Sequence, residues 1–191
     1  MKLNVVSLAL WSVTIIPTFA QLPEDLKRKF DEAERRIVRL SPTAFPELPR
    51  SMVRELQRRG CTIPQTAYTN KPHNVIKGQF AKSGQTDWAV LCSVKGVSTI
   101  LVFWNSSERN PAAIAPMEDR IFLQGITPDN IGYSRGISAV GKDFIMRHYD
   151  AYAGPKPPST DHQGIDDAFI EKASVTWYFQ DGKWLKLTGA D

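Results

Sequence analysis

The stretch "TDWAVLCSVKGVSTILVFW", residues 86–104, holds two apolar runs separated by Lys95 and Gly96. Each run is apolar at odd and even positions alike, which is typical of a strand buried on both faces. The valine, isoleucine and aromatic residues in these runs favour β-structure, and the pair between them suits a tight turn. The stretch therefore predicts two central strands, 86–94 and 97–104, joined as a β-hairpin.

Further strands are predicted on both sides of this hairpin. Residues 74–80 and 120–124 have a similar composition and are bounded by glycine, proline, asparagine and serine, as strands commonly are. Near the C-terminus, "SVTWYFQDGKWLKL", residues 174–187, places Asp181 and Gly182 between two apolar runs, which is a strong hairpin signal. A two-residue turn there pairs Gln180 with Lys183, Phe179 with Trp184, and Tyr178 with Leu185.

The N-terminal part of the chain predicts two helices. Residues 23–40 begin with a proline and two acidic residues, which suit a first helical turn, and their apolar side chains recur at steps of three and four. A shorter helix, 49–59, is expected to end at Gly60. Helices followed by strands indicate an α+β fold with two N-terminal helices packed on a largely antiparallel sheet. We expect one domain, with a helical segment at 21–60 and a β-rich part at 61–191.

Residues 1–20 have the parts of a secretory signal peptide. A lysine near the start is followed by an apolar run from Val5 to Ile16 and by small residues before a cleavage site after Ala20. Cleavage leaves Gln21 first, where no cysteine stands to carry a lipid. We therefore expect a secreted or periplasmic protein without a stable membrane anchor.

The net charge of +4 arises in the first third of the chain. Residues 21–60 hold ten Lys and Arg against seven Asp and Glu, whereas residues 61–191 hold thirteen of each. The basic residues alternate with acidic ones and have no aromatic residues interleaved, a pattern typical of a solvated helix face. A nucleic-acid partner is therefore not expected.

The chain has two cysteines, Cys61 and Cys92. In an oxidising compartment an isolated pair favours one disulfide, which here closes a loop of about 30 residues and contributes about 3 to 4 kcal/mol. A redox pair needs C-x-x-C spacing and a metal site needs nearby histidines, and neither accompanies these cysteines. We predict a structural bridge between them.

Seven segments spread over nearly the whole of residues 21–191 carry a resemblance. They are "GCTIPQ", "NVIKGQF", "GQTDWAVLCS", "ILVFW", "GKDFIMRHYDAY", "DHQGIDDAF" and "GKWLKLTGAD". Together they resemble a group of small, uncharacterised secreted bacterial proteins with no known activity. The resemblance implies secretion and assigns no chemistry.

A second, local resemblance involves "GQFAKSGQTDWAVL", residues 78–91. It is similar to repeats of the FG-GAP and VCBS type, in which a Gly-x-Phe strand leads through an acidic calcium loop to a second strand. The resemblance implies a strand-turn-strand unit. Only Asp87 is acidic in the loop of this chain, and calcium requires several oxygen ligands. We expect no calcium here, and no other motif predicts a cofactor.

"GYSRG", residues 132–136, fits the G-x-S-x-G pattern of serine hydrolases around Ser134. A nucleophile elbow needs a buried strand before the serine and a helix after it. Turn residues at 128–130 precede Ser134, and the β-branched run "ISAV" follows it. The pattern therefore favours a tight turn leading into a strand, and a catalytic Ser134 is the less favoured interpretation.

Four other residues form a candidate ligand or metal loop. Asp161, His162, Asp166 and Asp167 lie within "STDHQGIDDAF" and are suitable ligand types for a divalent metal. Their spacing matches no known metal motif. Asp166 or Asp167 before "AFIEKA" equally suits the N-cap of a helix, and the metal site and the cap remain alternatives.

His148 lies in "DFIMRHYDAY", residues 143–152, which alternates as a strand does. Such a strand places Phe144 and His148 on one face. A histidine satisfied within the core or at its rim is the favoured interpretation, ahead of a ligand or a catalytic base.

These patterns favour a binding, interaction or inhibitor protein without enzymatic activity. Trp177, Tyr178 and Trp184 on the C-terminal hairpin are a candidate aromatic surface for a protein or saccharide ligand. The alternative is a hydrolase, which uses either a metal at the Asp161 to Asp167 loop or Ser134 as nucleophile.

Overall fold

The computed structural model describes residues 23–187, so the predicted signal peptide at 1–20 lies outside the described residues. The α+β class is confirmed: within residues 23–187, three α-helices accompany several antiparallel sheets. The helices are α1 (Glu24–Arg35), α2 (Arg50–Arg58) and α3 (Lys142–Tyr152), with short 3-10 turns at Pro42–Ala44, Trp104–Ser106 and Asp119–Phe122. None of the helices in residues 23–187 has the length and apolar character needed to cross a membrane.

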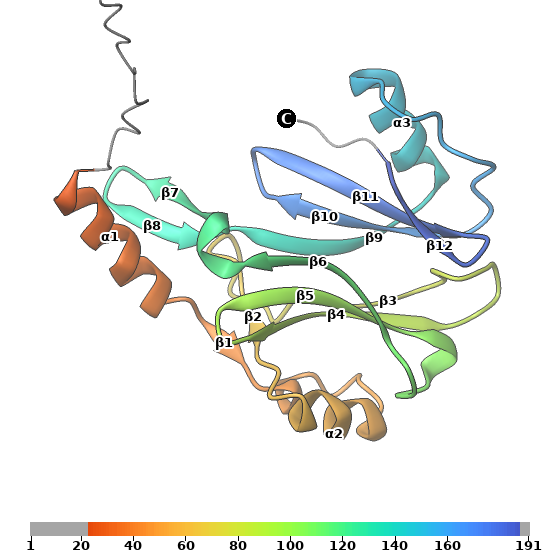
Figure 1. Ribbon diagram of the computed structural model, residues 1–191, viewed down its shortest axis with the longest axis horizontal. Helices are drawn as coiled ribbons and strands as arrows, with labels where there is room; N and C mark the ends of the chain where they lie inside the picture. The colour runs from red at the N-terminus through yellow and green to blue at the C-terminus, as the bar shows by residue number, and fades with distance from the viewer. Residues whose placement is uncertain (1–22, 188–191) are drawn as a thin grey trace, which may run out of the picture.

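Two four-stranded antiparallel sheets pack face to face (Figure 1). The first contains, in spatial order, β3 (Val75–Gly78), β4 (Asp87–Val94), β5 (Val97–Phe103) and β6 (Ala112–Glu118). The second contains β12 (Lys183–Lys186), β11 (Ala173–Gln180), β10 (Gly164–Phe169) and β9 (Arg135–Val140). Ile100 and Val102 from the first sheet meet Ile137 and Ile165 from the second in one buried cluster. That cluster is the core of the sandwich.

Both predicted hairpins are confirmed. The central hairpin joins β4 and β5 with Trp88 opposite Phe103, and the C-terminal one joins β11 and β12 with the predicted pairs in register. The turn residues have positive φ: 52° and 80° at Lys95 and Gly96, and 50° and 77° at Asp181 and Gly182. Two successive positive φ angles match the right-handed twist of the flanking strands.

Helix α2 covers the outer face of the first sheet (Figure 1). Met52 and Leu56 on the helix are fully buried against β4 and β5 residues such as Val90. The predicted disulfide is confirmed: Cys61 follows α2, Cys92 lies in β4, and their Cα atoms are 5.2 Å apart. The bridge fixes the end of the helix to the middle of the sheet.

Helix α1 ends at Arg35, so the prediction of a helix over 23–40 is too long. Two apolar residues that follow the helix pack in different places. Ile37 is buried with Ala33 of α1, whereas Leu40 packs against the cluster that contains Met52 and Leu56 of α2. Residues Arg39–Leu40 instead form β1, which pairs with β2 (Ile63–Pro64).

A separate hairpin of β7 (Leu123–Thr127) and β8 (Asn130–Tyr133) supports α1 (Figure 1). Ala33 of the helix is buried with Phe122, Leu123 and Tyr133. The strand predicted at 120–124 is correct only for residues 123–124, which begin β7, because Asp119–Phe122 is a 3-10 turn.

Two further predictions are wrong. Residues 143–152 form most of α3 and not a strand, because a four-residue repeat of apolar side chains satisfies a helical face as well as strand alternation. The N-cap suggested at Asp166 or Asp167 does not exist, since Gly164–Phe169 is strand β10, paired on both sides.

Candidate functional site

Ser134 is a buried residue in the one-residue break between β8 and β9. The predicted strand after Ser134 is confirmed as β9, but the predicted tight turn at Ser134 is wrong, because strand β8 comes directly before this residue. Its Oγ donates to the Gly132 carbonyl oxygen at 3.4 Å, and its backbone N–H donates to the carbonyl of Phe122 at 2.9 Å. The Ser134 carbonyl oxygen accepts a hydrogen bond from the Ile170 N–H at 3.0 Å. The two backbone contacts join Ser134 to other segments of the chain, whereas the Oγ contact is local.

The next residue, Arg135, is fully buried and connects the two sheets. Its guanidinium forms a two-point pair with Asp167, at 2.8 and 2.9 Å. It also donates to Ser98 Oγ and the Ser98 carbonyl on β5, and to the Ala115 carbonyl on β6. Asp167 is therefore engaged in the interior of the sandwich.

The structure does not bring the four residues of the predicted ligand loop together. Asp166 and Asp167 are adjacent on β10 and so point to opposite faces of the sheet. The Asp161 side chain is exposed, and the His162 ring stacks on Tyr178 at 4.3 Å between centroids. Among residues 23–187, no group of three or more His, Cys, Asp or Glu side chains is arranged to hold a metal ion.

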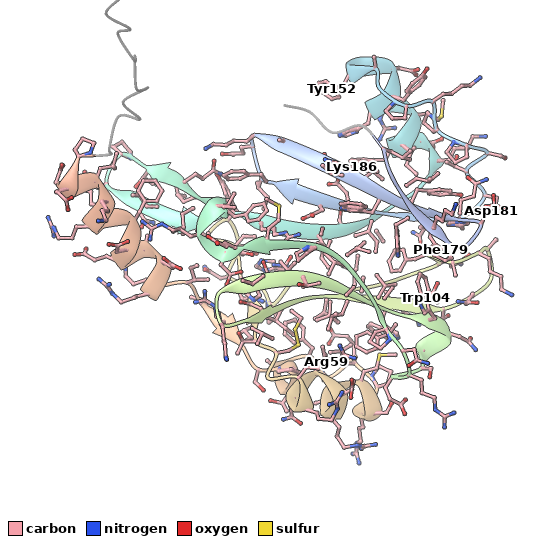
Figure 2. All side chains as sticks on the ribbon, viewed as in Figure 1. Arg59, Trp104, Tyr152, Phe179, Asp181 and Lys186 are labelled. Atoms are coloured by element: carbon pink, nitrogen blue, oxygen red, sulfur yellow. A yellow bond between two sulfur atoms is a disulfide. The ribbon has the colours of Figure 1, made fainter. Side chains whose placement is uncertain are left out.

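The three residues of the predicted aromatic surface are also divided between two faces. Tyr178 is only 1% exposed and packs with Val140 and Ile145 under α3. Trp177 and Trp184 face the other sheet and pack against the sandwich core. The Trp184 ring stacks with the Trp104 ring, with 5.7 Å between the ring centroids. The Phe179 ring centroid lies 4.8 Å from that of Trp104, at one end of the sandwich (Figure 2). The aromatic residues thus close the interior.

Asp87 has a structural role in the segment that resembles FG-GAP repeats. Its Oδ2 accepts the backbone N–H groups of Phe80 and Ala81 at 2.8 and 2.9 Å, and its Oδ1 accepts that of Asn105 at 2.8 Å. The Phe80 ring folds back over Gly78, where a Cβ would lie 2.5 Å from the ring. The carboxylate binds backbone amides, and the glycine provides room for the ring.

An open groove of about 470 Å³ lies between α3 and the hairpin of β10 and β11. One wall is a row of rings on α3, Phe144, His148 and Tyr152, spaced four residues apart. The Phe144 and His148 rings stack at 4.1 Å, and His148 and Tyr152 lie 5.7 Å apart. The prediction of a strand at 143–152 concealed this wall. The four-residue spacing of the rings is the sequence signal that reveals it.

Asp166 and Ser174 line the opposite side of the groove, on neighbouring strands. Asp166 is 8% exposed, and its Oδ1 is a buried atom without a hydrogen-bond partner among residues 23–187. Burial raises the pKa of the Asp166 carboxyl, while hydrogen bonding by Ser174 and the proximity of His148 lower that pKa. The net pKa shift is upward, so the groove contains a carboxyl whose charge is poorly compensated.

His148 Nε2 lies 3.3 Å from Ser174 Oγ, so a carboxyl, a hydroxyl and an imidazole adjoin one another. In a serine-nucleophile site the acid orients the imidazole, which then takes the proton of the serine. Here Ser174 lies between the acid and the imidazole and interacts with both. This order suits hydrogen bonding to a ligand better than activation of the hydroxyl.

Comparison with known proteins gives no relative from which a role can be transferred. No protein-family model, no curated protein and no solved structure matches this chain.

Proposed function

We propose that this chain is a secreted or periplasmic binding protein without enzymatic activity, and that its ligand occupies the groove between α3 and the β10–β11 hairpin. The signal-peptide pattern of residues 1–20 and the Cys61–Cys92 disulfide support secretion. Disulfides persist mainly in oxidising compartments.

The single observation that carries this proposal is the state of Asp166. A buried polar atom without a hydrogen-bond partner lowers stability by about 1 to 3 kcal/mol, and Asp166 Oδ1 is such an atom. The residue lines an open groove, where a ligand can supply the absent partner. A carboxyl in a cleft whose pKa is shifted by burial is a candidate for a functional site.

The walls of the groove support the same proposal. Tyr152 is 54% exposed at the end of α3 (Figure 2), in line with the stacked rings of Phe144 and His148. Aromatic side chains give a ligand a large contact area together with specific geometry. Polar groups on the opposite side, from Asp166 and Ser174, provide hydrogen bonds that orient the ligand.

An NMR titration of the ¹⁵N-labelled protein tests the proposal. The probes are hexasaccharides of glucose and N-acetylglucosamine, blocked tripeptides, and small amines and acids. We expect at least one class to shift the amide signals of α3 and of residues 166–174 selectively. If no probe perturbs these residues, or if all binding maps elsewhere, the groove is not the ligand site.

The competing hypothesis, a hydrolase, now has its best support in the contact of His148 with Ser174. A fluorophosphonate probe, with Ser134→Ala and Ser174→Ala variants as controls, separates the two functions. We expect no labelling of either serine, because Ser134 is buried and Ser174 interacts with the Asp166 carboxyl. Labelling that disappears in one variant would establish the enzyme instead.

A further inference from the structure

We propose that the groove recognises a cationic group, a primary ammonium or a guanidinium, which pairs with Asp166 and lies against the rings on α3. This inference rests on the proposed binding function and specifies the chemistry of the ligand. It follows from three features of the groove, which concern its charges, its rings and its shape.

The first feature is the balance of charge. Besides His148, the groove is lined by two acids, Asp166 and Glu171, and one base, Lys172. Glu171 accepts a hydrogen bond from the Tyr68 hydroxyl at 2.8 Å, and the Lys172 ammonium lies over the Phe169 ring. Within residues 23–187, no Lys or Arg forms an ion pair with Asp166.

A cation compensates this carboxylate better than other ligands do. A neutral hydroxyl can donate a hydrogen bond, but the charge of a buried carboxylate is stabilised chiefly by an opposite charge. An anionic ligand would be repelled by it. The contrast with Asp167 is direct, because that neighbouring carboxylate has the Arg135 guanidinium as its partner. In the described part of the chain, Asp166 has no cationic partner of the kind that Asp167 has.

The second feature is the aromatic wall. The faces of aromatic rings attract cations that come within about 6 Å of the ring centroid. The groove already contains one such contact, with Lys172 Nζ 4.6 Å from the Phe169 ring centroid. Phe144 and Tyr152 line the opposite wall. The rings there offer a second position for a cation, on the side of α3.

The third feature is the arrangement of the walls. Asp166, Ala168 and Ser174 lie on one face of the sheet, because Ala168 is opposite Ser174 and Asp166 is two residues from Ala168. Rings from α3 bound the other side. A cation on a flexible alkyl chain can pack its methylene groups along the rings while its head reaches Asp166. Lysine and arginine side chains and small alkylamines share this shape.

Isothermal titration with matched probes tests the inference. The probes are n-butylammonium, n-butanol and butyrate, together with the N-acetyl N-methylamides of lysine, arginine and norleucine. We expect each cation to bind at least tenfold more tightly than its neutral or anionic counterpart. Comparable affinities for n-butylammonium and the lysine amide would indicate a free amine as ligand, whereas tighter binding of the amide would indicate a basic side chain of a partner protein.

Two variants locate the interaction. Asp166→Asn should reduce the affinity for the cations to that for the neutral probes. Asp181→Asn makes the same change of charge at the remote hairpin turn (Figure 2), where asparagine preserves the turn, and it should leave binding within twofold of the original. Tyr152→Ala, at an exposed position, should weaken binding about threefold.

The inference is overturned if the neutral probes bind as tightly as the cations, or if Asp181→Asn lowers affinity as much as Asp166→Asn does. If saccharides or neutral peptides shift the groove signals and the cations do not, the groove is a binding site and the proposed charge recognition is wrong. If no probe shifts those signals, the binding function fails as well. The two failures are therefore distinguishable.

Discussion

Arg135 and Asp167 form a buried, two-point ion pair, with Nε 2.8 Å from Oδ1 and Nη2 2.9 Å from Oδ2. Both residues belong to the second sheet, yet the same guanidinium donates to Ser98 and Ala115 on the first sheet. One side chain therefore joins the two halves of the sandwich through polar contacts inside an otherwise apolar core.

Replacement of this arginine is expected to destabilise the protein severely. Arg135→Met leaves the Asp167 carboxylate buried without its partner, and the loss of one partner from a buried pair destabilises proteins by about 3 to 5 kcal/mol. Urea denaturation measures the change. Arg28→Met is the control, because the exposed Arg28–Glu32 pair should contribute less than about 1 kcal/mol. Equal effects of the two variants would contradict the proposed role of Arg135.

Asp87→Asn should also be strongly destabilising. Both carboxylate oxygens of Asp87 accept hydrogen bonds, so the amide of asparagine would direct N–H donors at other donors. We expect a loss of about 3 kcal/mol, since hydrogen bonds to charged groups contribute about 1.5 to 3 kcal/mol each. Thermal unfolding of the variant and the original protein measures this loss. The same measurement with and without millimolar calcium tests the expectation that the loop binds no calcium. A clear rise of Tm with calcium would show that the loop binds the ion after all.

The disulfide is expected to contribute about 3 to 4 kcal/mol, the value for a loop of this length. The Cys61→Ala/Cys92→Ala double variant removes the bridge between the end of α2 and β4. Its midpoint in urea should fall accordingly, and reduction should shift the original protein to nearly the same midpoint. Intact mass should show no free thiol in the purified protein, and a free thiol would contradict the structure.

Asp166→Asn should stabilise the protein at neutral pH. Because burial raises the pKa of Asp166 in the folded state, the original protein loses stability as pH rises from the ordinary value of 3.8 through the raised pKa. The variant lacks this loss, so we expect a gain of about 1 kcal/mol, or about 2 to 4 °C in Tm, near pH 7. The gain should vanish below the ordinary aspartate pKa, where both side chains are neutral.

Thermal unfolding between acidic and neutral pH measures this difference, with Asp181→Asn as the charge-matched control. A variant that is less stable than the original at neutral pH would show that the Asp166 carboxylate is well compensated in the fold. The premise of the cationic ligand would then be lost.

The parts of the fold that the sequence predicts are those with strong local signals. The central strands are apolar on both faces, the turns at Gly96 and Gly182 have suitable residues, and the chain has one pair of cysteines. These signals depend on near neighbours in the chain. Helix α3 was missed because Phe144, His148 and Tyr152 occupy positions that alternation and a helical face share.

The site depends on contacts between distant residues and so was beyond local patterns. The sequence places Asp166, Asp167 and His162 in one candidate ligand loop, but the pleat of β10 sends the two aspartates to opposite faces. The burial of Arg135 and the role of Asp87 have no sequence signature, since charged residues of both types are usually exposed.

The two adjacent aspartates of β10 raise a question of strand alignment. A slip of β10 by one residue would present Asp166 to Arg135 in place of Asp167, so the ion pair by itself accepts either alignment. The same slip would place Gln163 where Gly164 now lies, and a Cβ at that position meets the Trp177 carbonyl oxygen at 3.0 Å. The slip would also move Ile165 out of the buried core of the sandwich. Gly164 and Ile165 therefore both favour the observed alignment, in which Asp167 pairs with Arg135 and Asp166 lines the groove.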